Sequence, residues 1–215
     1  VRADVSSLRP RYRRGGVRVV GEVTRSVPEL IERIAQIFDE VGIEYVIGGS
    51  FASSMLGEPR ATQDVDVAVL LDEPSLERLL SITEGEFYVP VEAARASLAH
   101  AVPMPSFNLV DLEGHGKVDV FVLGDSVLDR RQIDHRIRVR IADGFEAWVT
   151  APVEVVLRKL LWMSLGENMS DRQWRDVVGV LSANRDSIDL DDLRSTAAEL
   201  GLAGLLVEAL RQAGE

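Results

Sequence analysis

The sequence contains no cysteine and only three histidines, His100, His115 and His135, among its 215 residues. The absence of cysteine excludes disulfides, thiolate zinc sites and cysteine nucleophiles. Because no two of the histidines are spaced as a pair, a histidine-based metal site is also disfavoured. Any metal ion must then be held mainly by carboxylates, the ligands typical of magnesium or manganese sites.

Long hydrophobic runs are missing as well. No apolar run reaches the roughly 18 residues that a transmembrane helix needs, so no membrane partner is expected. The first residues are rich in arginine and lack the apolar stretch of a secretory signal, which leaves the cytoplasm as the expected location. With 46% hydrophobic and 27% charged residues, the chain has the composition of an ordinary globular protein.

Positive charge is scarce overall, since the formal net charge is −11. This value argues against a surface adapted to nonspecific nucleic-acid binding. Arginines are nevertheless concentrated in residues 1–27 and again between Arg130 and Arg140. These two clusters leave local contact with RNA open, although a flexible arm and a solvated surface are the simpler interpretation.

Hydrophobic periodicity divides the chain into the segments 1–27, 28–150 and 151–215. The first is expected to be a basic, extended or poorly ordered arm. The second alternates helical and strand patterns, and the third has helical patterns only. The predicted fold class is therefore α/β or α+β, with a mixed β-sheet flanked by helices and followed by a C-terminal helical region.

The individual elements follow from periodicity, glycines and helix-start residues. In the second segment, helices are predicted at 28–41, 50–57, 74–83, 91–101 and 125–136, and strands at 44–49, 64–71, 106–112 and 116–124. A hairpin is predicted over 136–150, closed by Asp143-Gly144. The C-terminal helices are predicted at 151–166, 170–185, 190–201 and 203–214, with Pro152, Ser170 and Asp189 at three of their starts.

Two aspartates one residue apart, Asp64 and Asp66, lie inside the strand pattern DVDVAV. Strand alternation places both carboxylates on one face and the valines on the other. Like charges on a sheet face repel, and their burial is unfavourable unless something neutralises them. Asp119 has the same setting in KVDVF, and a neighbouring strand can bring it to the same face. Three such carboxylates predict a two-metal site of the kind used for phosphoryl or nucleotidyl transfer.

A glycine turn, Gly48-Gly49-Ser50, precedes the aspartates. Gly48 and Gly49 allow the backbone to approach a triphosphate, and Ser50 offers a hydroxyl. The short helix that follows directs its N-terminal amides at anionic oxygens. Arg60 is a further candidate for pairing with phosphate.

The order GGS, then Arg60-x-Thr62-x-Asp64-x-Asp66, then Asp119 resembles the polymerase-beta-type nucleotidyltransferase superfamily. The resemblance covers roughly residues 43–123 and is closest to the bacterial group that includes the abortive-infection nucleotidyltransferase toxins. Residues 150–181 resemble the helical segment that follows in that group, and the opening is also similar to the head domain of CCA-adding enzymes. The resemblance implies a nucleotidyltransferase fold.

The resemblance also implies roles for individual residues. Asp64 and Asp66 would bind divalent metal ions, Mg²⁺ or Mn²⁺, and Asp119 would complete the metal site and assist deprotonation of the acceptor hydroxyl. Gly49 and Ser50 would hold the triphosphate.

Six further residues have open interpretations. Lys159 matches a lysine that faces the nucleotide phosphates in related proteins, and a helix-surface lysine is the alternative. The spacing of Arg172 and Asp176 predicts an intrahelical ion pair. Trp162, like Trp174, is expected in the core, although either indole is able to stack on a base. His115 is expected to be an exposed loop residue.

The leading hypothesis is an enzyme that transfers a nucleoside monophosphate from an NTP to a hydroxyl, with release of pyrophosphate. The acceptor is left open between a tRNA 3′ end, a protein side chain and a small molecule such as a cationic antibiotic. The toxin resemblance implies a toxin–antitoxin role and an antitoxin partner. The alternative is a noncatalytic module that binds nucleotides or partner proteins, which the presence of all three carboxylates disfavours.

Overall fold

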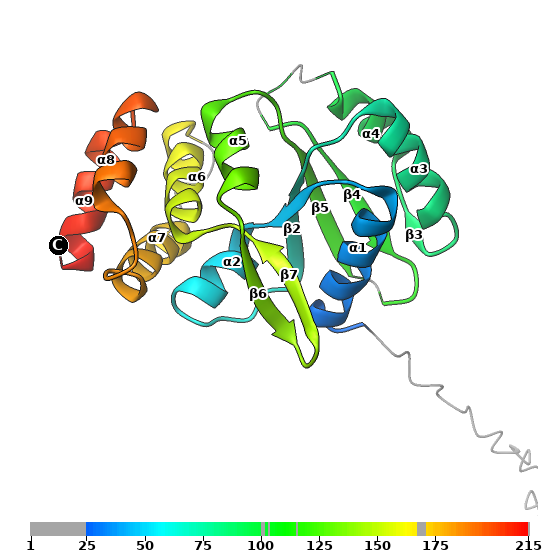
Figure 1. The fold of residues 1–215 in the computed structure, drawn as a ribbon, viewed down its shortest axis with the longest axis horizontal. Coiled ribbons are helices and arrows are strands. Elements are labelled where there is room, and N and C mark those ends of the chain that lie inside the picture. The colour runs from blue at the N-terminus through cyan, green and yellow to red at the C-terminus, as the bar shows by residue number, and fades with distance from the viewer. Residues whose placement is uncertain (1–24, 100–101, 103, 115, 167–170, 215) are drawn as a thin grey trace, which may run out of the picture.

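The computed structural model describes residues 25–99, 102, 104–114, 116–166 and 171–214. Within these residues a mixed β-sheet with the strand order β3-β4-β5-β2-β1-β7-β6 is flanked by helices (Figure 1). The C-terminal helices gather at one side of the sheet (Figure 1). This architecture confirms the predicted mixed α/β fold class.

The centre of the sheet is formed by strands that are distant in the sequence. β2 (Asp64–Val69) pairs in parallel with β5 (Lys117–Val122), and β1 (Tyr45–Ile47) pairs antiparallel with β2. β4 (Ser106–Asp111) forms an antiparallel hairpin with β5. The predicted hairpin is confirmed as β6 (Ile137–Ala142) and β7 (Phe145–Val149), with Asp143-Gly144 between them. The edge strand β3 (Phe87–Tyr88) was not predicted, because two residues are too few to show alternation.

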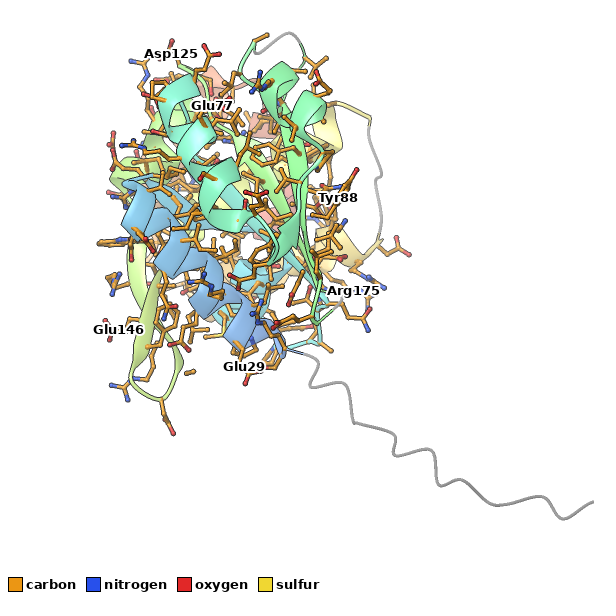
Figure 2. All side chains as sticks on the ribbon, turned by 90° about the vertical axis from the view of Figure 1, so that its right-hand side faces the viewer. Glu29, Glu77, Tyr88, Asp125, Glu146 and Arg175 are labelled. Atoms are coloured by element: carbon orange, nitrogen blue, oxygen red, sulfur yellow. The ribbon has the colours of Figure 1, made fainter. Side chains whose placement is uncertain are left out.

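Five helices accompany the sheet strands in the chain: α1 (Val27–Val41), α2 (Gly49–Leu56), α3 (Glu73–Thr83), α4 (Val91–Ser97) and α5 (Val127–Asp134). α4 ends at Ser97 rather than at the predicted residue 101, and residues 100 and 101 lie outside the described residues. Figure 2 shows the start of α1, marked by Glu29, and the β6–β7 hairpin, marked by Glu146, at the end of the molecule opposite Asp125.

The start of α1 lies one residue before the predicted one, inside the segment expected to be an arm. The backbone N–H of Ser26 donates to Glu29 Oε2 at 2.7 Å, which caps the first turn. Arg25 pairs with Asp111 and Glu86 at N–O distances of 3.1 and 3.0 Å. Residues 25–27 are therefore part of the folded structure, and the rest of the predicted arm, 1–24, lies outside the described residues.

The helices after residue 150 are α6 (Pro152–Ser164), α7 (Asp171–Ala183), α8 (Leu190–Glu199) and α9 (Ala203–Ala213). Pro152 begins α6 and Asp189 caps α8, as predicted, whereas Ser170 lies outside the described residues. One continuous hydrophobic core extends from Leu30 in α1 to Ala213 in α9, and α6 and α7 both pack on α2. The C-terminal helices are therefore packed against the element that follows the glycine turn. None of the helices in the described ranges is long and apolar enough to cross a membrane.

Candidate active site

Asp64, Asp66 and Asp119 lie on one face of the neighbouring strands β2 and β5. Asp66 and Asp119 are Cα partners in the parallel ladder, and Asp64 stands opposite Lys117 on the same face. Asp64 is exposed, and Asp66 and Asp119 are half-buried, whereas the valines between them are buried on the other face. The structure thus brings together the three carboxylates singled out from the sequence.

The ionised form of Asp66 is energetically disfavoured in this position. Burial raises the pKa of its carboxyl group above the usual value for an aspartate, and the nearby charges of Asp119 and Asp64 add to the rise. The backbone N–H of Ser50, 3.4 Å from Asp66 Oδ2, and the ammonium group of Lys159 act in the opposite direction. The strand face formed by Asp64, Asp66 and Asp119, here called the carboxylate face, therefore carries negative charge that the neighbouring groups do not fully neutralise.

Lys117 partly neutralises this face. Its Nζ lies 2.8 Å from Asp119 Oδ2, and this hydrogen bond is the main reason why the pKa of Lys117 is raised. The charges of Asp64 and Asp66 also attract it. As the side chains stand, no three acidic or histidine residues in the described part of the chain are arranged to enclose a metal ion. Sequence reasoning missed Lys117, although its place two residues before Asp119 puts it on the same strand face.

The glycine turn lies directly against Asp66. The backbone N–H of Gly48 donates to the carbonyl oxygen of Asp66 at 2.8 Å. Gly49 has a φ of +56°, and a Cβ atom built there would lie 1.8 Å from Asp66 Oδ2. Only glycine fits this contact, which holds the N-terminus of α2 beside the carboxylates.

We therefore expect Gly49→Ala to reduce both stability and nucleotide binding. The left-handed backbone alone costs about 1–2 kcal/mol for a residue with a Cβ, and the clash displaces Asp66 as well. Thermal unfolding and calorimetric titration with NTP measure the two effects. Gly144→Ala is the matched control, because Gly144 has a φ of +80° but no atom within 4 Å of the added Cβ. Equal behaviour of the two variants would contradict the close approach at Gly49.

On the other side of the glycine turn, the carboxylate of Asp176 in α7 pairs with two positively charged side chains, those of Lys159 and Arg60. Asp176 Oδ2 lies 2.9 Å from Lys159 Nζ and 3.0 Å from Arg60 Nη2. Ser53 Oγ donates to the same oxygen at 3.2 Å. Arg60 Nη2 also donates to Ser50 Oγ at 2.7 Å, so this network reaches the glycine turn.

This network corrects two of the sequence interpretations. The carboxylate of Asp176 binds residues of other elements, so the interpretation as a plain intrahelical pair with Arg172 was wrong. Lys159 is only 9% exposed, which rules out a helix-surface lysine. Burial opposes ionisation of Asp176, but hydrogen bonds from Arg60 and Lys159 outweigh it, so its pKa is lowered. The sequence did not reveal the contacts of Asp176 with Arg60 and Lys159, because no local pattern shows which elements pack against a given helix face.

A cavity of about 590 Å³ opens beside Asp66. Gly48, Asp66 and Lys159 line one part of it, and Phe121 and Trp162 line another. Trp162 was expected in the core but is half-buried and borders this cavity. Trp174, also half-buried, instead donates from Nε1 to Gln212 Oε1 at 2.8 Å, and His115 lies outside the described residues.

Comparison with known proteins identifies relatives by structure only. No protein-family model matches the sequence, and no curated protein matches it significantly. An antigenic nucleotidyltransferase-like protein from Paracoccidioides brasiliensis is 20% identical, with a TM-score of 0.51 over 86% of this chain and 92% of that one. ANT(2")-Ia in complex with adenylyl-2"-tobramycin is 13% identical, with a TM-score of 0.52 over 80% of this chain and 95% of that one. At these identities the similarity concerns the fold, and the chain has the fold of the nucleotidyltransferases.

Proposed function

We propose that this protein is a metal-dependent nucleotidyltransferase that moves a nucleoside monophosphate from an NTP to a hydroxyl acceptor. The observation that supports this most is the position of Asp66. It is paired in register with Asp119 on one side and touches the glycine turn on the other. A carboxylate face and an anion-binding turn in direct contact are the two parts that nucleotidyl transfer requires.

Magnesium or manganese fits the donor set of the carboxylate face. Asp64 and Asp66 supply hard oxygen ligands, and the burial that raises the pKa of Asp66 favours a cation beside its carboxylate. Asp119 supplies the third carboxylate once its ion pair with Lys117 is broken. A bound divalent ion supplies positive charge that stabilises the developing negative charge on the phosphoryl oxygens.

The residues on the other side of Asp66 hold the triphosphate in this proposal. The positive end of the α2 helix dipole, at Gly49 and Ser50, attracts the anion, and Arg60 and Lys159 add positive charge. Asp176 holds these two cationic side chains beside the turn. It is therefore a positioning residue in this scheme.

Asp119 accepts the proton of the acceptor hydroxyl as its oxygen attacks the α-phosphorus. The new bond joins that oxygen to the α-phosphorus, and the bond between the α-phosphorus and its bridging oxygen to the β-phosphorus breaks. The leaving group is pyrophosphate. The products are the nucleotidylated acceptor and pyrophosphate, with the proton initially on Asp119.

The acceptor class that we propose is a hydroxyl of RNA, such as tRNA, or of protein, as in the toxin group that the sequence resembles, with an antitoxin as partner. The second arginine cluster contributes less to RNA binding than its sequence suggests. Arg131 pairs with Glu154 at 2.9 Å, and Arg136 pairs with Glu44 at 2.9 Å. A cationic small molecule is the second candidate acceptor, favoured by the net charge of −11 and by the adenylyl-tobramycin complex of the structural neighbour.

The decisive experiment offers the protein each radiolabelled NTP with Mg²⁺ and a whole-cell extract. Label is expected in the RNA, protein or small-molecule fraction, and the fraction that is labelled identifies the acceptor class. Absence of label from all three fractions, together with Mg²⁺-dependent NTP binding in calorimetry, would instead identify a noncatalytic nucleotide-binding module.

Lys117→Met is expected to raise the affinity for Mn²⁺ several-fold. The ammonium group of Lys117 pairs with the carboxylate of Asp119 and adds positive charge near Asp64 and Asp66. A metal ion must therefore compete with Lys117 for the same carboxylates. Electron paramagnetic resonance of free Mn²⁺ measures the binding directly. Arg95→Met is a control, because Arg95 pairs with Glu77 at an exposed position. Unchanged or weaker Mn²⁺ binding in Lys117→Met would exclude this competition.

A further inference from the structure

The cavity beside Asp66 continues along the face that carries the carboxylates. Ala68 and Phe121 are Cα partners two residues beyond Asp66 and Asp119, so an apolar pair follows the acidic pair on the same face. Ala68, Phe121 and Asp66 all line the cavity. A ligand with its phosphates at the glycine turn therefore has an apolar surface directly beside them.

The helix that carries Lys159 provides an aromatic wall of the same cavity. Trp162 follows Lys159 by three residues, so both lie on one face of α6, about 4.5 Å apart along its axis. The rings of Trp162 and Phe121 meet edge to face, with centroids 6.5 Å apart. Two aromatic rings beside Lys159 form a surface on which a flat heteroaromatic ring can stack.

Polar groups at a third part of the cavity wall offer donors. Arg158 Nη2 donates to Asp129 Oδ1 at 2.6 Å and also to Gln132 Oε1. Asp129 Oδ2 accepts from the backbone N–H of Gly124 at 3.2 Å, so the acceptors here are largely occupied. The Nε of Arg158 is buried and has no hydrogen-bond partner within the described part of the chain. Because Nε itself is inaccessible, a ligand in the cavity would meet the part of the Arg158 side chain that is exposed, 14% of its surface.

We propose that this cavity is the nucleobase subsite, in which the base of the NTP stacks on Trp162 and directs a carbonyl oxygen or ring nitrogen toward Arg158. This proposal rests on the proposed nucleotidyltransferase function. The volume of about 590 Å³ lies in the range of small-molecule sites.

The test compares two kinds of probe, the NTPs and inorganic tripolyphosphate, which lacks the nucleoside. Calorimetry in Mg²⁺ measures the affinities of ATP, GTP, CTP, UTP and inorganic tripolyphosphate for the wild type and for Trp162→Leu. We expect the best-bound NTP to bind about tenfold more weakly to Trp162→Leu, while tripolyphosphate binds as to the wild type. Trp162→Phe, which keeps an aromatic face, is expected to lose only part of the affinity. Thermal unfolding verifies that each variant is folded.

Trp174→Leu is the matched control, because Trp174 is equally half-buried but contacts Gln212 outside this cavity. It should leave both affinities unchanged. Unchanged NTP binding by Trp162→Leu, or an equal loss for NTP and tripolyphosphate, would overturn the subsite assignment alone. An increased KM for the acceptor with unchanged NTP affinity would assign the cavity to the acceptor. Failure of the wild type to bind either probe would overturn the proposed function, and the subsite with it.

Discussion

Asp66→Asn is expected to abolish nucleotide transfer and to leave the metal-free protein at least as stable as the wild type. Loss of a residue beyond the direct metal ligands typically lowers activity or metal affinity about 10–100-fold. Because we place Asp66 among the ligands themselves, its replacement should lower the rate at least about 100-fold. Asparagine retains the shape that packs against Gly49 and removes the charge that burial and neighbouring aspartates disfavour.

The pH dependence gives this prediction a second measurement. The pKa of Asp66 is raised in the folded protein, so between the ordinary pKa of aspartate and that raised value the folded state binds more protons than the unfolded state. The contribution of Asp66 to stability therefore becomes less favourable as the pH rises through this window, and its full penalty is present above it. In EDTA, the Tm of Asp66→Asn relative to wild type should increase as the pH rises through the same window.

A control variant separates the site from a general loss of negative charge. Asp143→Asn removes one carboxylate at the β6–β7 turn, where an Asn-Gly pair suits the hairpin as well as Asp-Gly. It should transfer label at the wild-type rate. If Asp66→Asn also transfers labelled nucleotide as fast as the wild type, the assignment of the carboxylate face as the active site is wrong.

The second large effect is expected for Asp176→Ala, which should lower the free energy of unfolding by about 3 kcal/mol or more and also reduce NTP affinity. Removal of one partner from a buried ion pair leaves the other charge uncompensated. Here the remaining charge is Lys159, whose side chain is 11% exposed, with Arg60 beside it. Chemical denaturation and calorimetry with NTP measure the two losses.

Two comparisons make this prediction specific. Glu208→Ala removes a carboxylate that pairs with Arg211 on the surface of α9, where loss of an exposed ion pair should have little effect on stability. The double variant Lys159→Met, Asp176→Ala removes the uncompensated ammonium group and should regain stability without regaining NTP affinity. Restored NTP affinity in the double variant would show that Lys159 does not contact the triphosphate.

Acid is expected to reduce the stabilising contribution of Asp176. The pKa of this carboxyl group is lowered in the folded protein, so its contribution is complete above the ordinary aspartate pKa. It is lost as the pH falls through the lowered value. As the pH falls, the stability of Asp176→Ala relative to the wild type should therefore rise, whereas that of Asp66→Asn relative to the wild type should fall.

Local patterns in the sequence predicted most of the elements that carry the site. The alternation in DVDVAV and KVDVF placed Asp64, Asp66 and Asp119 on polar strand faces, and the glycine turn was correctly located before a short helix. The same reasoning missed β3 and extended α4 beyond Ser97, because two strand residues show no alternation and helix periodicity does not mark where a helix ends.

The sequence also left the partners of individual charges undetermined. Lys117 and Asp119 lie on one strand, yet only the pairing of β5 with β2 brings Lys117 to Asp64 and Asp66. Asp176 follows Arg172 by one helical turn, so spacing predicted an intrahelical pair, whereas its partner Arg60 is 116 positions away. Helical spacing predicts which residues share a face of one helix, but not what that face meets.

The amino-acid sequence by itself determined the fold class and the polar face of each strand, because side-chain periodicity depends only on local backbone geometry. Only the tertiary structure decided that Asp66 stands beside Asp119, that a Cβ at Gly49 would strike Asp66, and that Asp176 joins Arg60 to Lys159. These contacts arise from strand register and helix packing, which depend on residues far apart in the chain.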